Sequence, residues 1–103
     1  MTDHQSLIMF ILSGGVLATG LGDYITTAIG LGKGMVEVNP INKFLFSKIG
    51  QPLTAFFEIA LGIFTPIIIA QQAGFAYGAV YAAGLIALEA TMTIRNAKLL
   101  KLI

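Results

Sequence analysis

Residues 7–32 read LIMFILSGGVLATGLGDYITTAIGLG and contain one charged side chain, that of Asp23. The run is longer than the roughly 20 apolar residues that a helix needs to cross the hydrocarbon core of a bilayer. In lipid, a helix satisfies its backbone N–H and C=O groups within its own segment. We therefore predict a transmembrane helix here. We expect it to be retained, because Asp3 and His4 stand where a cleaved signal peptide would carry positive charge.

Two further apolar runs follow at residues 52–70 and 75–94, and each contains one acidic residue, Glu58 and Glu89 respectively. Over the whole chain 56% of the residues are hydrophobic and only 11% are charged, well below the quarter or so that is usual in soluble proteins. A chain of this length cannot bury so much apolar surface in a core of its own. We predict an all-α integral membrane protein with three transmembrane helices in a single membrane domain, residues 1–103, surrounded by the lipid bilayer.

The segment between the first two spans is more polar, and its Asn39-Pro40 pair is typical of a helix N-cap followed by proline at the first helical position. Within residues 40–49, apolar and polar side chains fall on different faces of a helix. This pattern predicts a short amphipathic helix in the membrane interface, with an ordinary surface loop as the alternative.

The basic residues predict the orientation. All of them follow the first or the third span, and the N-terminal tail and the turn at residues 71–74 have none. An odd number of spans places both basic segments on one side, which the positive-inside rule makes cytoplasmic. We predict a multi-pass protein of the cell (inner) membrane with its N-terminus outside and its C-terminus in the cytoplasm; a viral membrane is the alternative. The basic residues are Lys33, Lys43, Lys48, Arg95, Lys98 and Lys101.

Small residues recur every four positions in the first and third apolar segments. This small-xxx-small spacing is typical of helices that approach closely in lipid. The stripes can pack the helices of one chain, or they can join copies of the chain into a homo-oligomer. The residues that we predict to pack are Gly14, Ala18, Gly22, Gly74, Gly78 and Ala82.

Asp23, Glu58 and Glu89 share one depth in the predicted topology. With a rise of ~1.5 Å per residue, each lies roughly 9 to 14 Å from the cytoplasmic end of its helix. A charge at the centre of a span costs about 2.5 to 3.5 kcal/mol on insertion scales, so something must offset it. Four offsets stay open: pairing with basic side chains, protonation, a bound hard cation, or a polar cavity for a substrate.

Further oxygen atoms accompany these carboxylates. Asp23 and Thr27 share a helix face one turn apart, and the glycines that follow let Glu37 and Asn39 fold back toward that face. The candidate site therefore takes a cation or a proton, and the identity of a metal stays open. Its members are Asp23, Thr27, Glu37, Asn39, Glu58 and Glu89.

Other site chemistries are excluded or disfavoured. The absence of cysteine excludes disulfides, iron–sulfur ligation and thiol chemistry. The single histidine, His4, has no partners at metal-ligand spacing. The glycine stretch GLGKGM, residues 30–35, lacks the spacing of a phosphate-binding loop, and no basic stripe suits nucleic acid. We assign no catalytic residue and no cofactor, apart from the cation considered above.

The run D-Y-I-T-T, the glycines after it and E-V-N-P, together residues 23–40, resemble a family of uncharacterised small prokaryotic multi-pass membrane proteins, a domain of unknown function. Its signature is an Asp, a Thr four residues later, a glycine turn and E-x-N-P. The resemblance covers the first span and the loop after it. The resemblance marks five residues as candidate functional positions and implies no activity. They are Asp23, Thr27, Glu37, Asn39 and Pro40.

These features favour a small membrane protein that acts through helix–helix assembly or protein partners, with the acidic cluster either structural or a cation or proton site. One alternative is a viral membrane protein such as a phage holin, which the short length and basic C-terminal tail suit; its expression would stop growth abruptly. Another is an intramembrane enzyme that uses the carboxylates on a lipid-linked substrate. The lack of a recognised catalytic motif favours a role that is not enzymatic.

Overall fold

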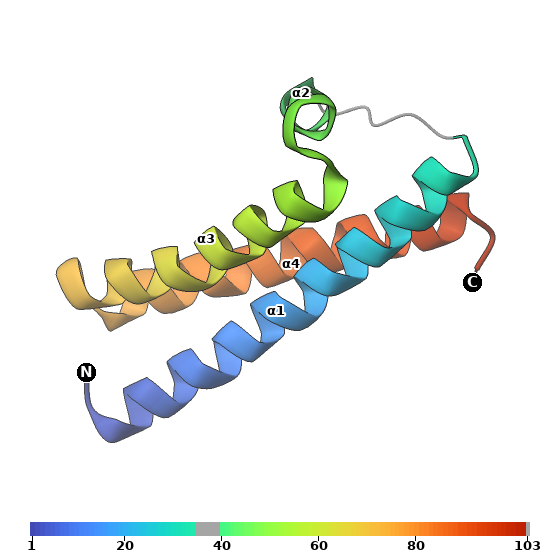
Figure 1. The fold of residues 1–103 in the computed structure, drawn as a ribbon. Coiled ribbons are helices and arrows are strands. Elements are labelled where there is room, and N and C mark those ends of the chain that lie inside the picture. Colours follow the sequence, from blue (N-terminus) through green and yellow to red (C-terminus); the bar gives the residue numbers. More distant parts are fainter. Residues whose placement is uncertain (35–39, 103) are drawn as a thin grey trace.

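The computed structural model describes residues 1–34 and 40–102, and within these ranges the chain forms helices and no strand. Figure 1 shows three long helices lying lengthwise beside one another and a short one across one end. The helices are α1 (Asp3–Gly32), α2 (Pro40–Ile49), α3 (Gln51–Gln72) and α4 (Phe75–Leu99).

α4 packs against both α1 and α3, α1 also contacts α3, and α2 packs on α3. The N-terminus and the turn between α3 and α4 lie at one end of the bundle, whereas α2 and the C-terminus lie at the other (Figure 1). Because α1 and α4 end at the same end of the bundle and α3 begins there, residues from distant parts of the sequence meet around the start of α3.

The prediction of an all-α membrane protein is confirmed, because α1, α3 and α4 are each long and apolar enough to cross a membrane. Only 11–17% of the most apolar window of each helix is buried inside the chain. Large side chains point away from the bundle, such as Phe10, which is 76% exposed, and Val80, which is 73% exposed. Such a surface suits contact with the acyl chains of a lipid bilayer.

The three long helices extend beyond the predicted spans, α3 by one residue at its start and by two at its end. α1 begins at Asp3 rather than at residue 7, because Thr2 forms a capping box with Gln5: the Gln5 backbone N–H donates to Thr2 Oγ1 at 3.2 Å, and the Thr2 N–H donates to Gln5 Oε1 at 3.0 Å. α4 continues past residue 94 to Leu99, because polar residues end a span without ending a helix.

The packing positions of α1 differ from the predicted stripe. Gly14 and Ala18 are exposed, whereas Val16 and Gly20 are buried against the other helices. An α-helix has 3.6 residues per turn, so a spacing of four drifts by about 40° at each step around the helix. Gly22 nevertheless lies against α4, because a Cβ built on this glycine would lie 3.1 Å from the Thr93 side chain.

On α4, Gly78 and Ala82 are buried as expected of packing residues. Gly78 faces the backbone of α3 at Pro66 and Ala70. Gly74 has a different role: it precedes the first residue of α4 with a φ of +126°, a conformation that L side chains rarely adopt. It therefore allows the tight turn between α3 and α4.

Candidate functional site

A cavity of about 550 Å³ lies where α1, α3 and α4 meet below α2. Every helix contributes to its wall, and the wall mixes polar side chains with apolar ones such as Ile59 and Met92. It lies in the half of the bundle that carries α2 and the C-terminus (Figure 1). The polar residues that line it are Asp23, Tyr24, Thr26, Thr27, Asn42, Gln51, Glu58, Glu89, Arg95 and Asn96.

A hydrogen-bonded cluster on one wall joins α4 to α1. The Asn96 side-chain amide donates to Asp23 Oδ1 at 3.2 Å and to Thr26 Oγ1 at 3.1 Å, and its nitrogen is 3.4 Å from the acceptor Thr27 Oγ1. The Thr27 hydroxyl in turn donates to Asp23 Oδ1 at 3.5 Å. The carboxylate of Asp23 therefore accepts hydrogen bonds from uncharged neighbours on two helices, which holds it in place inside the apolar segment.

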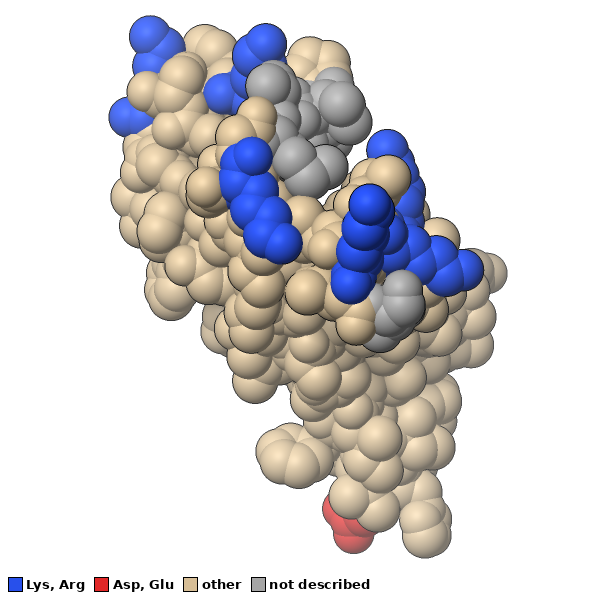
Figure 2. Space-filling view, turned by 90° about the vertical axis from the view of Figure 1, so that its right-hand side faces the viewer, with Lys and Arg blue, Asp and Glu red and all other residues tan. Residues whose placement is uncertain are grey.

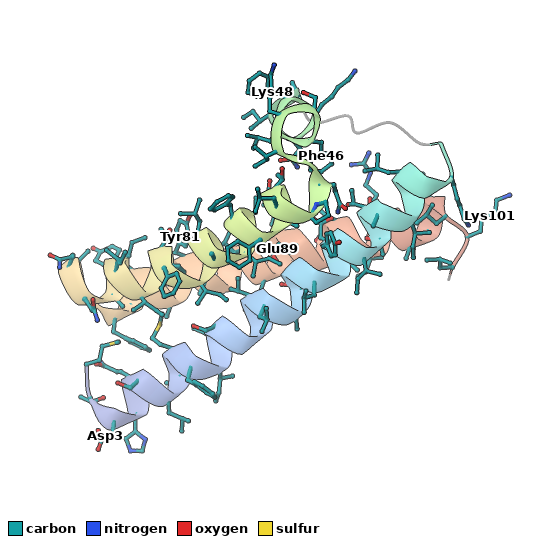
Figure 3. All side chains as sticks on the ribbon, in the orientation of Figure 1. Asp3, Phe46, Lys48, Tyr81, Glu89 and Lys101 are labelled. Atoms are coloured by element: carbon teal, nitrogen blue, oxygen red, sulfur yellow. The ribbon has the colours of Figure 1, made fainter. Side chains whose placement is uncertain are left out.

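Glu89 lies deeper in the bundle, between the ends marked by Asp3 and Lys101 (Figure 3). The hydroxyl of Thr19 donates to Glu89 Oε2 at 3.1 Å. Two glycines leave room for the carboxylate: a Cβ on Gly20 of α1 would lie 3.0 Å from Oε2, and one on Gly62 of α3 would lie 3.9 Å from Oε1. The small residues of α1 and α3 therefore shape the pocket that receives this α4 carboxylate.

The third carboxylate, Glu58, lines the cavity from α3 and is exposed. The start of α3 is tied to α1, because the Gln51 side chain donates to the Tyr24 carbonyl oxygen at 3.3 Å. From α4, Arg95 adds one guanidinium to the wall. Among the residues described, no group of three carboxylate or imidazole side chains is arranged to hold a metal ion.

The structure brings Asp23, Thr27, Glu58 and Glu89 of the predicted site to this one cavity. Glu37 and Asn39 lie outside the described residues. Basic side chains were considered as partners of the carboxylates. Arg95 lines the cavity, whereas Lys33 and Lys98 are not among the described residues of its wall.

Several polar residues of the site were missed by the sequence reasoning, namely Thr19, Asn42, Gln51 and Asn96 as members of the wall or as partners of its carboxylates. Helical spacing contained part of the signal. Asn96 is seven residues, about two turns, after Glu89, and Thr19 is about one turn before Asp23, so each pair shares a face. Asn42 and Gln51 had no such signal, because they reach the cavity only through the position of α2 and the start of α3.

No family model matches the chain, and searches of curated proteins and of solved structures find no similar protein. The cavity and the distribution of charge around it are therefore the features of the chain that bear on its function.

Proposed function

We propose that this multi-pass membrane protein binds a positively charged group in the cavity, through the carboxylates of Asp23, Glu58 and Glu89. The observation that carries the proposal is the composition of the wall: among the residues that the structure describes, three carboxylates face one cavity with a single guanidinium, that of Arg95. Each charge within a span costs up to about 2.5 to 3.5 kcal/mol. A cation bound between the carboxylates would offset this cost.

The dimensions favour an organic cation. A volume of about 550 Å³ lies within the range of roughly 300 to 1,000 Å³ that is usual for small-molecule sites. A dehydrated metal ion instead needs several oxygen ligands close together at about 2.0 to 2.6 Å. An ammonium group suits the cavity better, because carboxylates only accept hydrogen bonds and a primary ammonium donates three.

The charge distribution supports a cavity that faces the cytoplasmic half of the membrane. Figure 2 shows the Lys and Arg side chains gathered at one end of the visible face and an acidic side chain at the opposite end. The basic end of the bundle is the one at which α1 and α4 finish and α2 lies. By the positive-inside rule, this distribution supports our proposal that the C-terminus is in the cytoplasm and the N-terminus outside, in the inner membrane of a cell.

The amphipathic character of α2 supports a position in the interface on the same side. Ile41 and Phe44 are exposed, and the Lys48 ammonium lies 5.8 Å from the centre of the Phe44 ring. Phe46 lies on the side of α2 that faces the bundle, whereas Lys48 points away from it (Figure 3). Exposed apolar and basic side chains on one short helix suit the boundary between acyl chains and headgroups.

A second candidate is assembly of copies through α1. No described atom outside α1 lies within 4 Å of a Cβ built on Gly14, and Ala18 one turn later is exposed. This part of α1 can therefore approach a helix of another chain closely. Mass spectrometry of the detergent-solubilised protein tests this candidate: oligomers that Gly14→Leu abolishes support it, and a monomer at every concentration removes it.

Thermal unfolding of the purified protein in dodecyl maltoside tests cation binding, with ethanolamine hydrochloride as the probe and sodium chloride at equal ionic strength as the reference. A ligand at a concentration ten times its dissociation constant raises the free energy of unfolding by about 1.4 kcal/mol. For a chain of this size, this raises Tm by several degrees. We expect this rise to be lost in Asp23→Asn, Glu58→Gln and Glu89→Gln.

Asp3→Asn is the matched control, because it removes a carboxylate of the described chain that lies outside the cavity. Its rise in Tm should equal that of the wild type. Equal Tm values in ethanolamine and sodium chloride would overturn the proposal, and so would a rise that survives all three cavity substitutions. A Tm that responds to pH but to neither cation would point to a proton site instead.

A further inference from the structure

An apolar groove lies between α1 and α3 and meets the polar cavity. Its volume is about 490 Å³. Tyr24, Ala55 and Ile59 line both the groove and the cavity, so the two spaces share one wall. The other side chains that matter here are Leu17, Leu21, Phe56, Ala60, Ile63 and Phe64.

The groove runs along the membrane-spanning direction. From Tyr24 to Leu17 it follows α1 over about 10 Å, toward the end of the bundle that carries the N-terminus. On α3 it runs from Pro52 to Phe64, which covers about 18 Å in the same direction. A ligand with its polar part in the cavity can therefore extend an apolar chain along the groove toward the middle of the bilayer.

We propose that one membrane phospholipid with a primary ammonium in its headgroup occupies the cavity and the groove together. This inference rests on the proposed function, because the ammonium would contact Asp23, Glu58 and Glu89. The headgroup phosphate lies beside Arg95, whose guanidinium can donate two hydrogen bonds to it. One acyl chain lies in the α1–α3 groove.

The charges of the wall select this headgroup among the common ones. A headgroup with a phosphate and no amine could pair with Arg95, but it would bring a further negative charge to a wall with three carboxylates and no ammonium to contact them. A quaternary ammonium carries the positive charge but has no N–H to donate to the carboxylate oxygens. A free amine matches the carboxylates and leaves both Arg95 and the apolar groove unused.

The lipids retained by the protein test the inference. The protein is reconstituted in vesicles with equal parts of phosphatidylethanolamine, phosphatidylcholine and phosphatidylglycerol and extracted in a mild detergent, and the bound lipids are quantified by mass spectrometry. Hydrogen bonds between the ammonium and the carboxylates should make the bound amount of phosphatidylethanolamine about tenfold higher than that of either other lipid. Equal retention of the three lipids would overturn the inference.

Substitutions in the groove separate this inference from the proposed function. Ala60→Trp fills the groove without changing a residue of the polar cavity, and Leu17→Trp does so from an exposed position on α1 that tolerates a larger side chain. Leu61→Trp on the outward face of α3, 65% exposed, is the matched control.

We expect both groove variants to lose the tenfold preference and to keep the rise in Tm with ethanolamine, and the control to keep both. A preference that persists in both groove variants would overturn the placement of the acyl chain. If the wild type shows no lipid preference but ethanolamine still raises its Tm, the lipid inference fails and the proposed function stands. If ethanolamine does not raise the Tm of the wild type either, the proposed function fails together with the lipid inference.

Discussion

Replacement of Gly78 by alanine should push α3 and α4 apart. A Cβ at this position would contact the carbonyl oxygen of Pro66 and would lie 2.9 Å from the backbone nitrogen and 2.7 Å from the Cβ of Ala70. Backbone atoms and a methyl group cannot rotate away from an added carbon. The helices must therefore shift, which also moves the α4 carboxylate that lines the cavity.

The matched control is Gly84→Ala on the same helix, where no described atom beyond the neighbouring backbone lies within 4 Å of the added Cβ. Alanine within a helix raises the free energy of unfolding by about 1 kcal/mol relative to glycine, and this gain is common to both variants. Overpacking costs about 1 to 3 kcal/mol. Gly78→Ala should therefore be less stable than Gly84→Ala by about 1 to 3 kcal/mol, the size of the steric cost alone.

The free energies of unfolding can be measured by titrating sodium dodecyl sulfate into the protein in dodecyl maltoside micelles, with helix content followed by circular dichroism. Comparison of the two variants removes the difference in helix propensity, so only the contact with α3 remains. If both variants unfold at the same fraction of dodecyl sulfate, α4 does not approach α3 at Gly78 and the packing described above is incorrect.

Three further predictions concern the cavity and the topology. Gly20→Ala places a methyl group 2.8 Å from Ile59 Cγ1 and 3.0 Å from the Glu89 carboxylate, both in the wall of the cavity, and should weaken the ethanolamine-induced rise in Tm. Gly14→Ala on the same helix should leave the rise unchanged, and equal effects of the two would contradict the geometry. Asn96→Ala removes the amide that donates to Asp23 and should lower the free energy of unfolding by about 1 to 2 kcal/mol, as measured by dodecyl sulfate titration. Unchanged stability would mean that this amide does not hold α4 to α1. Finally, a green fluorescent protein fused to the C-terminus should be fluorescent and an alkaline phosphatase fused there inactive, and the reverse result would refute a cytoplasmic C-terminus.

The helices themselves were predictable from the sequence, because the length and hydrophobicity of a span are local properties of the chain. The short helix after Pro40 was predictable for a similar reason, since a proline start and amphipathic spacing act over one or two turns. The boundaries of α1 and α4 were less accurate. The extent of a helix depends on its caps and on backbone continuity, whereas hydropathy reports only the part that lipid would cover.

A similar depth for the three carboxylates was a prediction from the sequence, because the rise of a helix sets depth once the spans are known. Whether they face one another did not follow, because rotation about each helix axis depends on which faces pack together. The fold settled this rotation: Gly20 and Gly62 make room for Glu89, and Asn96 joins the side chains of α1.

The sequence alone thus determined the number of apolar helices and the basic end of the bundle, since each depends on composition along one segment. Only the tertiary structure decided that the three carboxylates share a cavity with Asn42, Gln51 and Asn96 and that an apolar groove meets it. A cavity is the space left between segments distant in sequence. Its shape therefore depends on how whole helices pack, which no single segment specifies.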